Sequence, residues 1–173
     1  MNGNDSIGIK IPADFIVSRA SLEPAESVYG YRNEWLKDRD AVAICLSALG
    51  QGGQLTSPEE QIALLLSDSF DEVSDLVNEL ERSLSLTRID PSAVWLFLAL
   101  AWLWENRMEQ VEPLEVIEML YADFGYPESI QGLVRFMPAP SGAQVGHRAI
   151  EQRWQDFVNR QSTYYRNRPP RRR

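Results

Sequence analysis

Cysteine and histidine are nearly absent from this chain of 173 residues, which holds one of each, Cys45 and His147. A structural zinc site takes four ligands, mostly cysteine and histidine, so these two residues are too few. A single cysteine also excludes a disulfide within the chain. Catalysis by a Ser/His/Asp or Cys/His system would depend on His147, and no sequence feature ties it to Cys45. We therefore expect no cofactor, no metal site and no catalytic residues of these classes.

Basic residues are scarce in the middle of the chain. Residues 57–128 contain three basic and sixteen acidic side chains, a net charge of −13, whereas the whole chain carries −8. The last fourteen residues, 160–173, hold six arginines and no acid. The protein is thus an acidic body with a basic end. Such a body attracts cationic proteins and repels nucleic acid, so we expect a basic protein as the partner and no nucleic acid.

Long hydrophobic runs are also missing. The most apolar stretch, residues 93–104, has twelve residues, and a helix needs roughly twenty to cross a bilayer. Residues 1–10 lack the charged and apolar regions of a signal peptide. We expect a cytoplasmic protein without contact to a membrane.

Proline and acidic or hydroxyl residues mark the starts of helices. The string Ser57-Pro58-Glu59-Glu60 offers Ser57 as N-cap, proline at the first helical position and Glu60 to close a capping box. Asp90-Pro91 repeats this chemistry before a helix that runs to about residue 105. Residues 94–104 are apolar on every side of that helix. We expect it to lie at the centre of the fold, surrounded by other helices.

The spacing of apolar residues predicts an all-α fold of seven or eight helices, packed as antiparallel pairs around the central helix 91–105. Residues 7–11, Ile-Gly-Ile-Lys-Ile, alternate briefly between isoleucine and other residues, and they are the one candidate for a short edge strand. We predict a single domain over residues 1–164 and a disordered arginine-rich tail over 165–173, which has the alternative of folding back on the acidic surface. The further predicted helices span residues 38–49, 57–66, 70–84, 114–124, 127–136 and 143–164.

Carboxylates are the abundant reactive groups, and two stretches place them three and four residues apart on one helical face. We predict these faces as partner-binding surfaces, with Tyr121 and Tyr126 as aromatic anchors; a merely solvated face and tyrosines packed in the core are the alternatives. The acids of the first stretch are Asp68, Asp71, Glu72, Asp75 and Glu79. Those of the second are Glu105, Glu109, Glu112, Glu115, Glu118 and Asp123.

Several strings carry a resemblance to a known family. The run from Trp95 to Asn106, the string Tyr121-Ala122-Asp123-Phe124-Gly125-Tyr126-Pro127 and the dipeptide Met137-Pro138 resemble a small family of bacterial helical proteins catalogued as a domain of unknown function. Tyr29-Gly30-Tyr31-x3-Trp35-Leu36 is similar to the N-terminal part of the same family. The resemblance covers residues 12–158 and implies a bacterial, all-helical, stand-alone domain without an established activity. By analogy, small acidic families of this kind resemble immunity proteins that neutralise toxins.

The leading hypothesis is a non-enzymatic bacterial binding protein, an immunity protein whose acidic helical surface covers the basic active site of a toxin such as a nuclease. A carboxylate- or metal-dependent enzyme is the first alternative, and it requires acids from separate helices to converge in a cleft. The second alternative is a helical adaptor that binds a peptide in a groove between helices.

Overall fold

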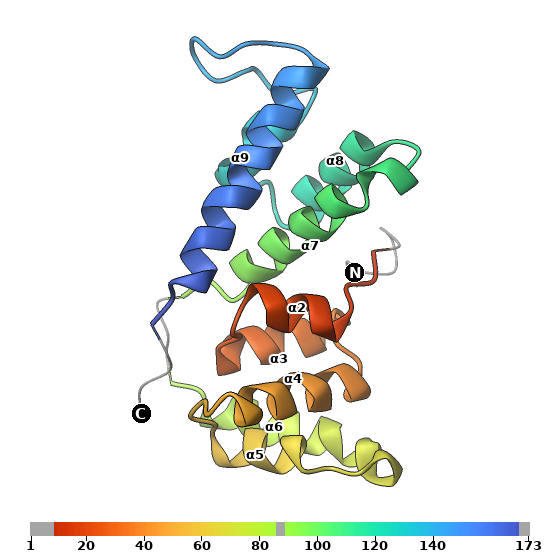
Figure 1. The fold of residues 1–173 in the computed structure, drawn as a ribbon, viewed down its shortest axis with the longest axis vertical. Coiled ribbons are helices and arrows are strands. Elements are labelled where there is room, and N and C mark those ends of the chain that lie inside the picture. Colours follow the sequence, from red (N-terminus) through yellow and green to blue (C-terminus); the bar gives the residue numbers. More distant parts are fainter. Residues whose placement is uncertain (1–8, 86–88, 170–173) are drawn as a thin grey trace.

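The computed structural model describes residues 9–85 and 89–169, and within these ranges the chain forms helices and no strands. This confirms the all-α class, with eight α-helices and three short 3-10 helices in the described part. Figure 1 shows α4, α5 and α6 at one end of the long axis, and α8 with one end of α9 toward the other. The elements are α2 (Ala13–Arg19), α3 (Pro24–Arg32), α4 (Asp38–Gly50), α5 (Ser57–Ala63), η1 (Ser67–Glu72), α6 (Val73–Ser83), α7 (Ala93–Glu105), η2 (Arg107–Glu109), α8 (Pro113–Asp123), η3 (Glu128–Leu133) and α9 (His147–Arg166).

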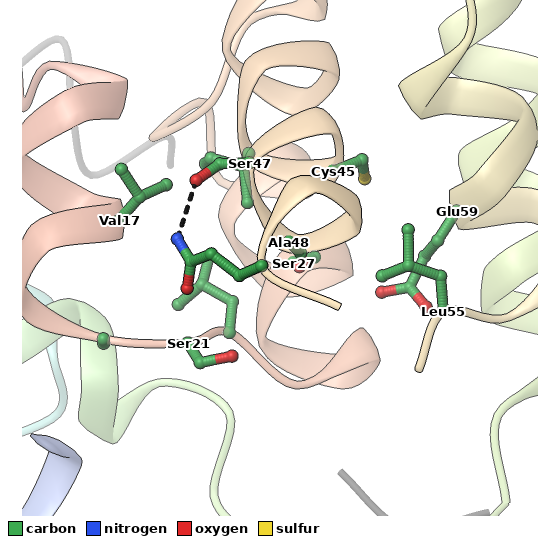
Figure 2. A pocket seen from close by; sticks show the side chains of 12 residues that line it. Val17, Ser21, Ser27, Cys45, Ser47, Ala48, Leu55 and Glu59 are labelled. Carbon is green, nitrogen blue, oxygen red and sulfur yellow. Dashed lines mark hydrogen bonds between the residues drawn. The ribbon is translucent and has the colours of Figure 1, made fainter. Parts of the chain in front are cut away.

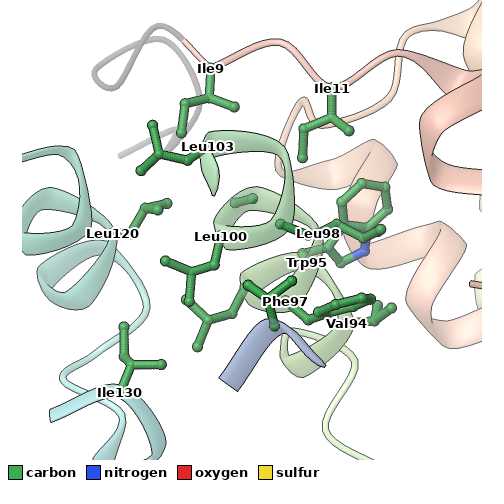
Figure 3. Packing of buried hydrophobic residues seen from close by; sticks show 14 of the residues in the cluster. Ile9, Ile11, Val94, Trp95, Phe97, Leu98, Leu100, Leu103, Leu120 and Ile130 are labelled. Carbon is green, nitrogen blue, oxygen red and sulfur yellow. The ribbon is translucent and has the colours of Figure 1, made fainter. Parts of the chain in front are cut away.

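The central helix is α7, which contacts α2, α3, α8 and α9. Its residues from Val94 to Ala101 are all buried, as expected for a helix that is apolar on every side. Figure 3 shows its side chains between Leu120 and Ile130 on one side and Ile9 and Ile11 on the other. α7 begins at Ala93, two residues after the predicted start, and its N-cap is Ser92 and not Asp90. The Asp90 carboxylate accepts hydrogen bonds from the backbone amide and the hydroxyl of Ser92 in the turn before the helix.

A second, smaller hydrophobic cluster holds α4, α5 and α6 together. α4 contributes the buried Ala41, Val42 and Cys45, and α6 contributes Val77 and Leu80 at a spacing of three residues. The apolar side of α6 therefore faces the cluster and leaves its acidic side to solvent. No helix among the described residues is both long enough and apolar enough to span a membrane.

The start of α5 differs from the sequence prediction by one residue. Thr56, and not Ser57, is the N-cap: its hydroxyl accepts from the Glu59 amide at 3.5 Å, and the Glu59 carboxylate accepts from the Thr56 amide at 2.8 Å. Both registers contain the capping pattern of a hydroxyl residue followed three residues later by glutamate. The observed register buries Glu59 and leaves Glu60 exposed.

The predicted helices near the C-terminus also have different bounds. The segment predicted as helix 127–136 forms only the 3-10 helix η3, which ends at Leu133. The last helix begins at His147 and not at residue 143, because Gly146 has a φ of +105°, outside the helical region. For the predicted strand 7–11, the described residues 9–11 have no strand partner and instead bury Ile9 and Ile11 in the core, while residues 7 and 8 lie outside the described part.

The end of the chain is more ordered than the predicted division at residue 164 implies. α9 continues to Arg166, and the buried ring of Tyr165 stacks on Phe97 of α7 with 5.0 Å between centroids. Arg168 forms an ion pair with the buried Glu26 of α3. Residues 165–168 are thus part of the folded domain. The tail prediction stays a prediction for residues 170–173, which lie outside the described part.

Candidate protein-interaction surface

The predicted partner-binding acids lie on two separate surfaces. Asp68, Asp71, Glu72, Asp75 and Glu79 belong to η1 and α6, and we name this set the α6 acidic surface. Glu109, Glu112, Glu115, Glu118 and Asp123 belong to η2, α8 and the turn between them, and we name this set the α8 acidic surface. Figure 1 shows α6 and α8 at opposite ends of the molecule. The fold does not bring the two predicted faces together.

The five acids of the α6 acidic surface are all exposed, and none of their carboxylates forms an ion pair with another described residue. Glu81, two residues after Glu79, pairs with Arg32 of α3 at 2.6 Å. The side of α6 that carries Val73, Val77 and Leu80 is buried. The acidic residues therefore face solvent alone, where like charges one turn apart repel each other by a few tenths of a kcal/mol per pair.

The α8 acidic surface is organised around one cation, Arg135. Its guanidinium donates two hydrogen bonds to the Glu118 carboxylate, at 2.7 and 3.0 Å. The same guanidinium lies 3.8 Å from the Glu115 carboxylate and 4.0 Å from that of Glu112. The hydrogen bond from Arg135 lowers the pKa of Glu118 below its usual value, and the same bond raises the pKa of Arg135. Three acids thus share one positive charge, and the surface remains net negative.

The first predicted acid of this stretch, Glu105, is separate from the α8 acidic surface. It ends α7 and forms an ion pair with Arg19 of α2, whose guanidinium also lies over the Phe15 ring at 5.0 Å. Glu105 therefore joins two helices of the fold. Glu109, the last residue of η2, and Asp123, the last residue of α8, are exposed.

Three aromatic rings meet near the end of α8, and we name Tyr121, Tyr126 and Phe136 the aromatic cluster. Tyr121 is buried, whereas Tyr126 and Phe136 are 63% and 65% exposed. The ring centroids of Tyr126 and Phe136 lie 5.2 Å and 6.3 Å from that of Tyr121. Of the two predicted anchors, Tyr126 presents its ring to solvent, and the buried Tyr121 packs against that ring.

The position of Tyr126 follows from the way α8 ends. Gly125 has a φ of +74°, and its amide donates to the Ala122 carbonyl at 3.1 Å. The next amide, that of Tyr126, donates to the Tyr121 carbonyl at 2.8 Å. These two bonds, with contact between the rings at their ends, make a Schellman motif, the common way to end a helix at glycine. The motif holds the Tyr126 ring at a defined place.

Phe136 and Arg135 are the members of this site that sequence reasoning missed. The sequence places both in the predicted helix over residues 127–136. Because η3 ends at Leu133, the two residues lie in the following turn, where both are exposed. Met119 is partly exposed on α8 and lies four residues from both Glu115 and Asp123, in the same stripe of the helix.

A carboxylate enzyme, the first alternative, requires acids from separate helices to converge in a cleft. Glu26 and Glu59 are the buried acids, and each closes the capping box of its own helix, α3 or α5. No group of three His, Cys, Asp or Glu residues in the described part is arranged to hold a metal ion. His147 is exposed and lies 3.5 Å from Glu151. Cys45 is buried in its helix, as predicted for a small hydrophobic residue.

A pocket between α2, α3, α4 and α5 contains Cys45 and Glu59 among its lining residues (Figure 2). Its free volume is about 30 Å³, which is room for about one water molecule. Two further lining residues are bonded to each other, since the Gln51 amide donates to the Ser47 hydroxyl at 3.1 Å. Larger hollows of about 290 Å³ and 250 Å³ lie between η3 and α9 and between the starts of α3 and α5 and the end of α6. Among the described residues, two acids line each of these hollows.

Residues 13–162 match the sequence profile of a family described as an uncharacterized protein conserved in bacteria, DUF2247. The chain belongs to the DUF2247 family. This confirms the resemblance seen in the sequence over nearly the same residues. The residues that match the DUF2247 profile include both acidic surfaces and the aromatic cluster, and they end before Tyr165 and Arg168. No curated protein and no solved structure matches this DUF2247 chain.

Proposed function

We propose that this protein is a non-enzymatic binding module whose aromatic cluster and α8 acidic surface together bind a basic protein. The observation that carries the proposal is the pair of exposed rings, Tyr126 and Phe136, both of which contact the buried Tyr121. Large exposed aromatic side chains are costly to hydrate and dominate the binding energy of protein interfaces. Tyr121 follows Glu118 by one helical turn, and Phe136 directly follows Arg135, which binds Glu118, so that an apolar anchor and a negative rim are neighbours in this part of the fold.

The charges support a cationic partner. Glu112, Glu115 and Glu118 share Arg135, so the helix keeps a net negative field next to the rings. Such a field speeds the encounter with a positive surface and selects against negative ones. The α6 acidic surface, at the other end of the molecule, adds to the long-range field, but the described part of its helix exposes no aromatic ring.

Within this class we propose an immunity function in the bacterial cytoplasm. The partner is a toxin with a basic active site, such as a nuclease, and the mechanism is occlusion of that site. A nuclease is positive where it holds phosphates, and an acidic inhibitor competes for the same charges. Membership of a bacterial family supports this setting.

The experiment measures binding and neutralisation of a basic toxin encoded by a gene next to that of this protein. The test variant is Tyr126→Ala/Phe136→Ala, which removes both exposed rings and leaves the buried Tyr121 in place. The matched control is Leu64→Ala/Leu66→Ala, which removes two exposed apolar side chains near α5. We expect the aromatic variant to bind at least about tenfold more weakly, and the leucine variant to bind as the wild type does.

A charge pair of variants separates the two acidic surfaces. Glu112→Gln/Glu115→Gln removes two charges beside the rings, and Asp71→Asn/Asp75→Asn removes two charges from the α6 acidic surface. The Glu112/Glu115 variant should associate much more slowly than the wild type, and its association rate should depend less on salt. The Asp71/Asp75 variant should associate at nearly the wild-type rate. Equal effects of the two double variants on the association rate would contradict the placement of the partner-binding surface at α8. If the wild-type protein neither binds nor neutralises any adjacent basic toxin, the immunity function is wrong.

A further inference from the structure

The last described turn of the chain inserts one arginine into the N-terminal half of the fold. Arg168 donates two hydrogen bonds to the Glu26 carboxylate, from Nη1 at 2.8 Å and from Nη2 at 2.9 Å. The Glu26 side chain is 1% exposed, and that of Arg168 is 11% exposed. A two-pronged bond of this kind matches the planar guanidinium and no other side-chain cation.

The groups that surround the Arg168 guanidinium are fixed by contacts with the core. The Tyr165 ring lies under it, with 4.6 Å from the guanidinium carbon to the ring centroid, and is itself stacked on Phe97. The Ser21 carbonyl accepts a third, longer bond at 3.4 Å. Glu26 is fixed from the other side, because its carboxylate accepts from the Glu23 amide at 2.8 Å and its carbonyl accepts from the Trp95 indole at 2.8 Å.

Arg168 itself is held mainly through its side chain. α9 ends at Arg166, and the last backbone bond of its cap runs from the Asn167 amide to the Thr163 carbonyl at 3.1 Å. Arg168 therefore belongs to the segment after the helix, while the carboxylate, the carbonyl and the ring belong to ordered elements of the core. It also lies beyond the residues that match the DUF2247 family, whereas Ser21 and Glu26 lie within them.

We propose that Glu26, the Ser21 carbonyl and the Tyr165 ring form a guanidinium-binding site, which Arg168 fills in the free protein and which an arginine of a protein partner enters when Arg168 withdraws. A carboxylate that is almost fully buried is strongly destabilised without a cation. Withdrawal of Arg168 is therefore coupled to the arrival of another guanidinium. This site is separate from the aromatic cluster and does not depend on the proposed function.

The test uses the full chain with Arg168→Ala and methylguanidinium as the probe. We expect the variant to melt about 5–10 °C below the wild type. Methylguanidinium at concentrations up to about 50 mM, where its denaturing effect is small, should restore part of this loss in a saturable manner. Methylammonium at equal ionic strength has the charge without the two-pronged geometry and should restore little. The wild type, whose site is filled, should show no rise.

Two further variants keep the outcome decisive. Glu26→Gln/Arg168→Ala removes the carboxylate and should lose the response to methylguanidinium. Arg168→Gln keeps one amide donor near Glu26 and replaces Arg168→Ala if that variant does not fold. A peptide amide with one arginine should act as methylguanidinium does, and its lysine counterpart should not. The proposal is overturned if the Arg168 variants show no saturable rise, or if the Glu26 double variant responds equally.

Discussion

The Tyr126 amide donates to the Tyr121 carbonyl at 2.8 Å, and the two rings meet edge to face at 5.2 Å. One residue thus ends helix α8 through its backbone and presents an aromatic ring through its side chain. The ring is positioned by the same bonds that satisfy the last carbonyls of the helix. Stability of the helix end and geometry of the candidate site are therefore linked, and a change in one is expected to appear in the other.

Gly125→Ala should destabilise the protein by about 1 kcal/mol, because alanine at a φ of +74° is strained. A Cβ at this position meets no atom within 4 Å, so the cost comes from the backbone alone. Urea unfolding measures it. Gly50→Ala is the matched control, since Gly50 is also open to solvent but is the last residue of α4 without a positive φ. A Gly125 variant as stable as this control would contradict the argument.

Gly30→Ala should destabilise the protein by about 2–3 kcal/mol through overpacking. A Cβ on Gly30 would lie 2.1 Å from the Trp95 ring, and that ring cannot shift freely because its indole N–H is bonded to the Glu26 carbonyl. Trp95→Phe removes the ring atoms that clash. In a double-mutant cycle followed by urea unfolding, the two changes together should therefore cost less than their sum. Strict additivity would show that Gly30 and Trp95 do not contact as described.

Arg135→Gln should change how the α8 acidic surface responds to pH. The folded pKa of Glu118 is lowered by its bond to Arg135, so the pair stabilises the folded state above the unfolded pKa of 4.5. That contribution is lost as the pH falls through the folded value. In the variant the NMR titration of Glu118 should move up toward the ordinary value.

The same variant should associate faster with a basic partner, because the acids lose their shared cation. An unmoved titration would contradict the contact.

Tyr165→Phe should make the protein lose less stability at high pH than the wild type does. Burial, together with the charge of Glu26, raises the pKa of Tyr165 from 10.0 to about 12. The folded state therefore favours the neutral phenol, and this contribution is present below pH 10 and fades as the pH rises toward 12. Melting temperatures of wild type and variant between pH 9 and 12 measure it. Tyr29 and Tyr31, whose pKa values are also raised, remain in both proteins and cancel in the comparison.

Helices with strong local signals could be predicted from the sequence. α7 is apolar on every side, and α8 lies between Pro113 and Gly125, so both follow from local pattern and local turn chemistry. The cap of α5 was placed one residue late, because Thr56 and Ser57 both precede a glutamate by three residues. α2 and α3 were not assigned. They are short, and α3 contains Gly30, whose role depends on a tryptophan sixty-five positions away.

The scarcity of metal ligands and the strong negative charge of residues 57–128 follow from residue types alone, and the spacing of apolar residues along the chain predicted the all-helical class. Only the tertiary structure decided which charges meet. It set the α6 and α8 acidic surfaces at opposite ends, brought Arg135 among three glutamates and carried Arg168 to Glu26, 142 residues away. Electrostatic and aromatic contacts act over a few ångströms of space, and distance along the chain does not reveal them.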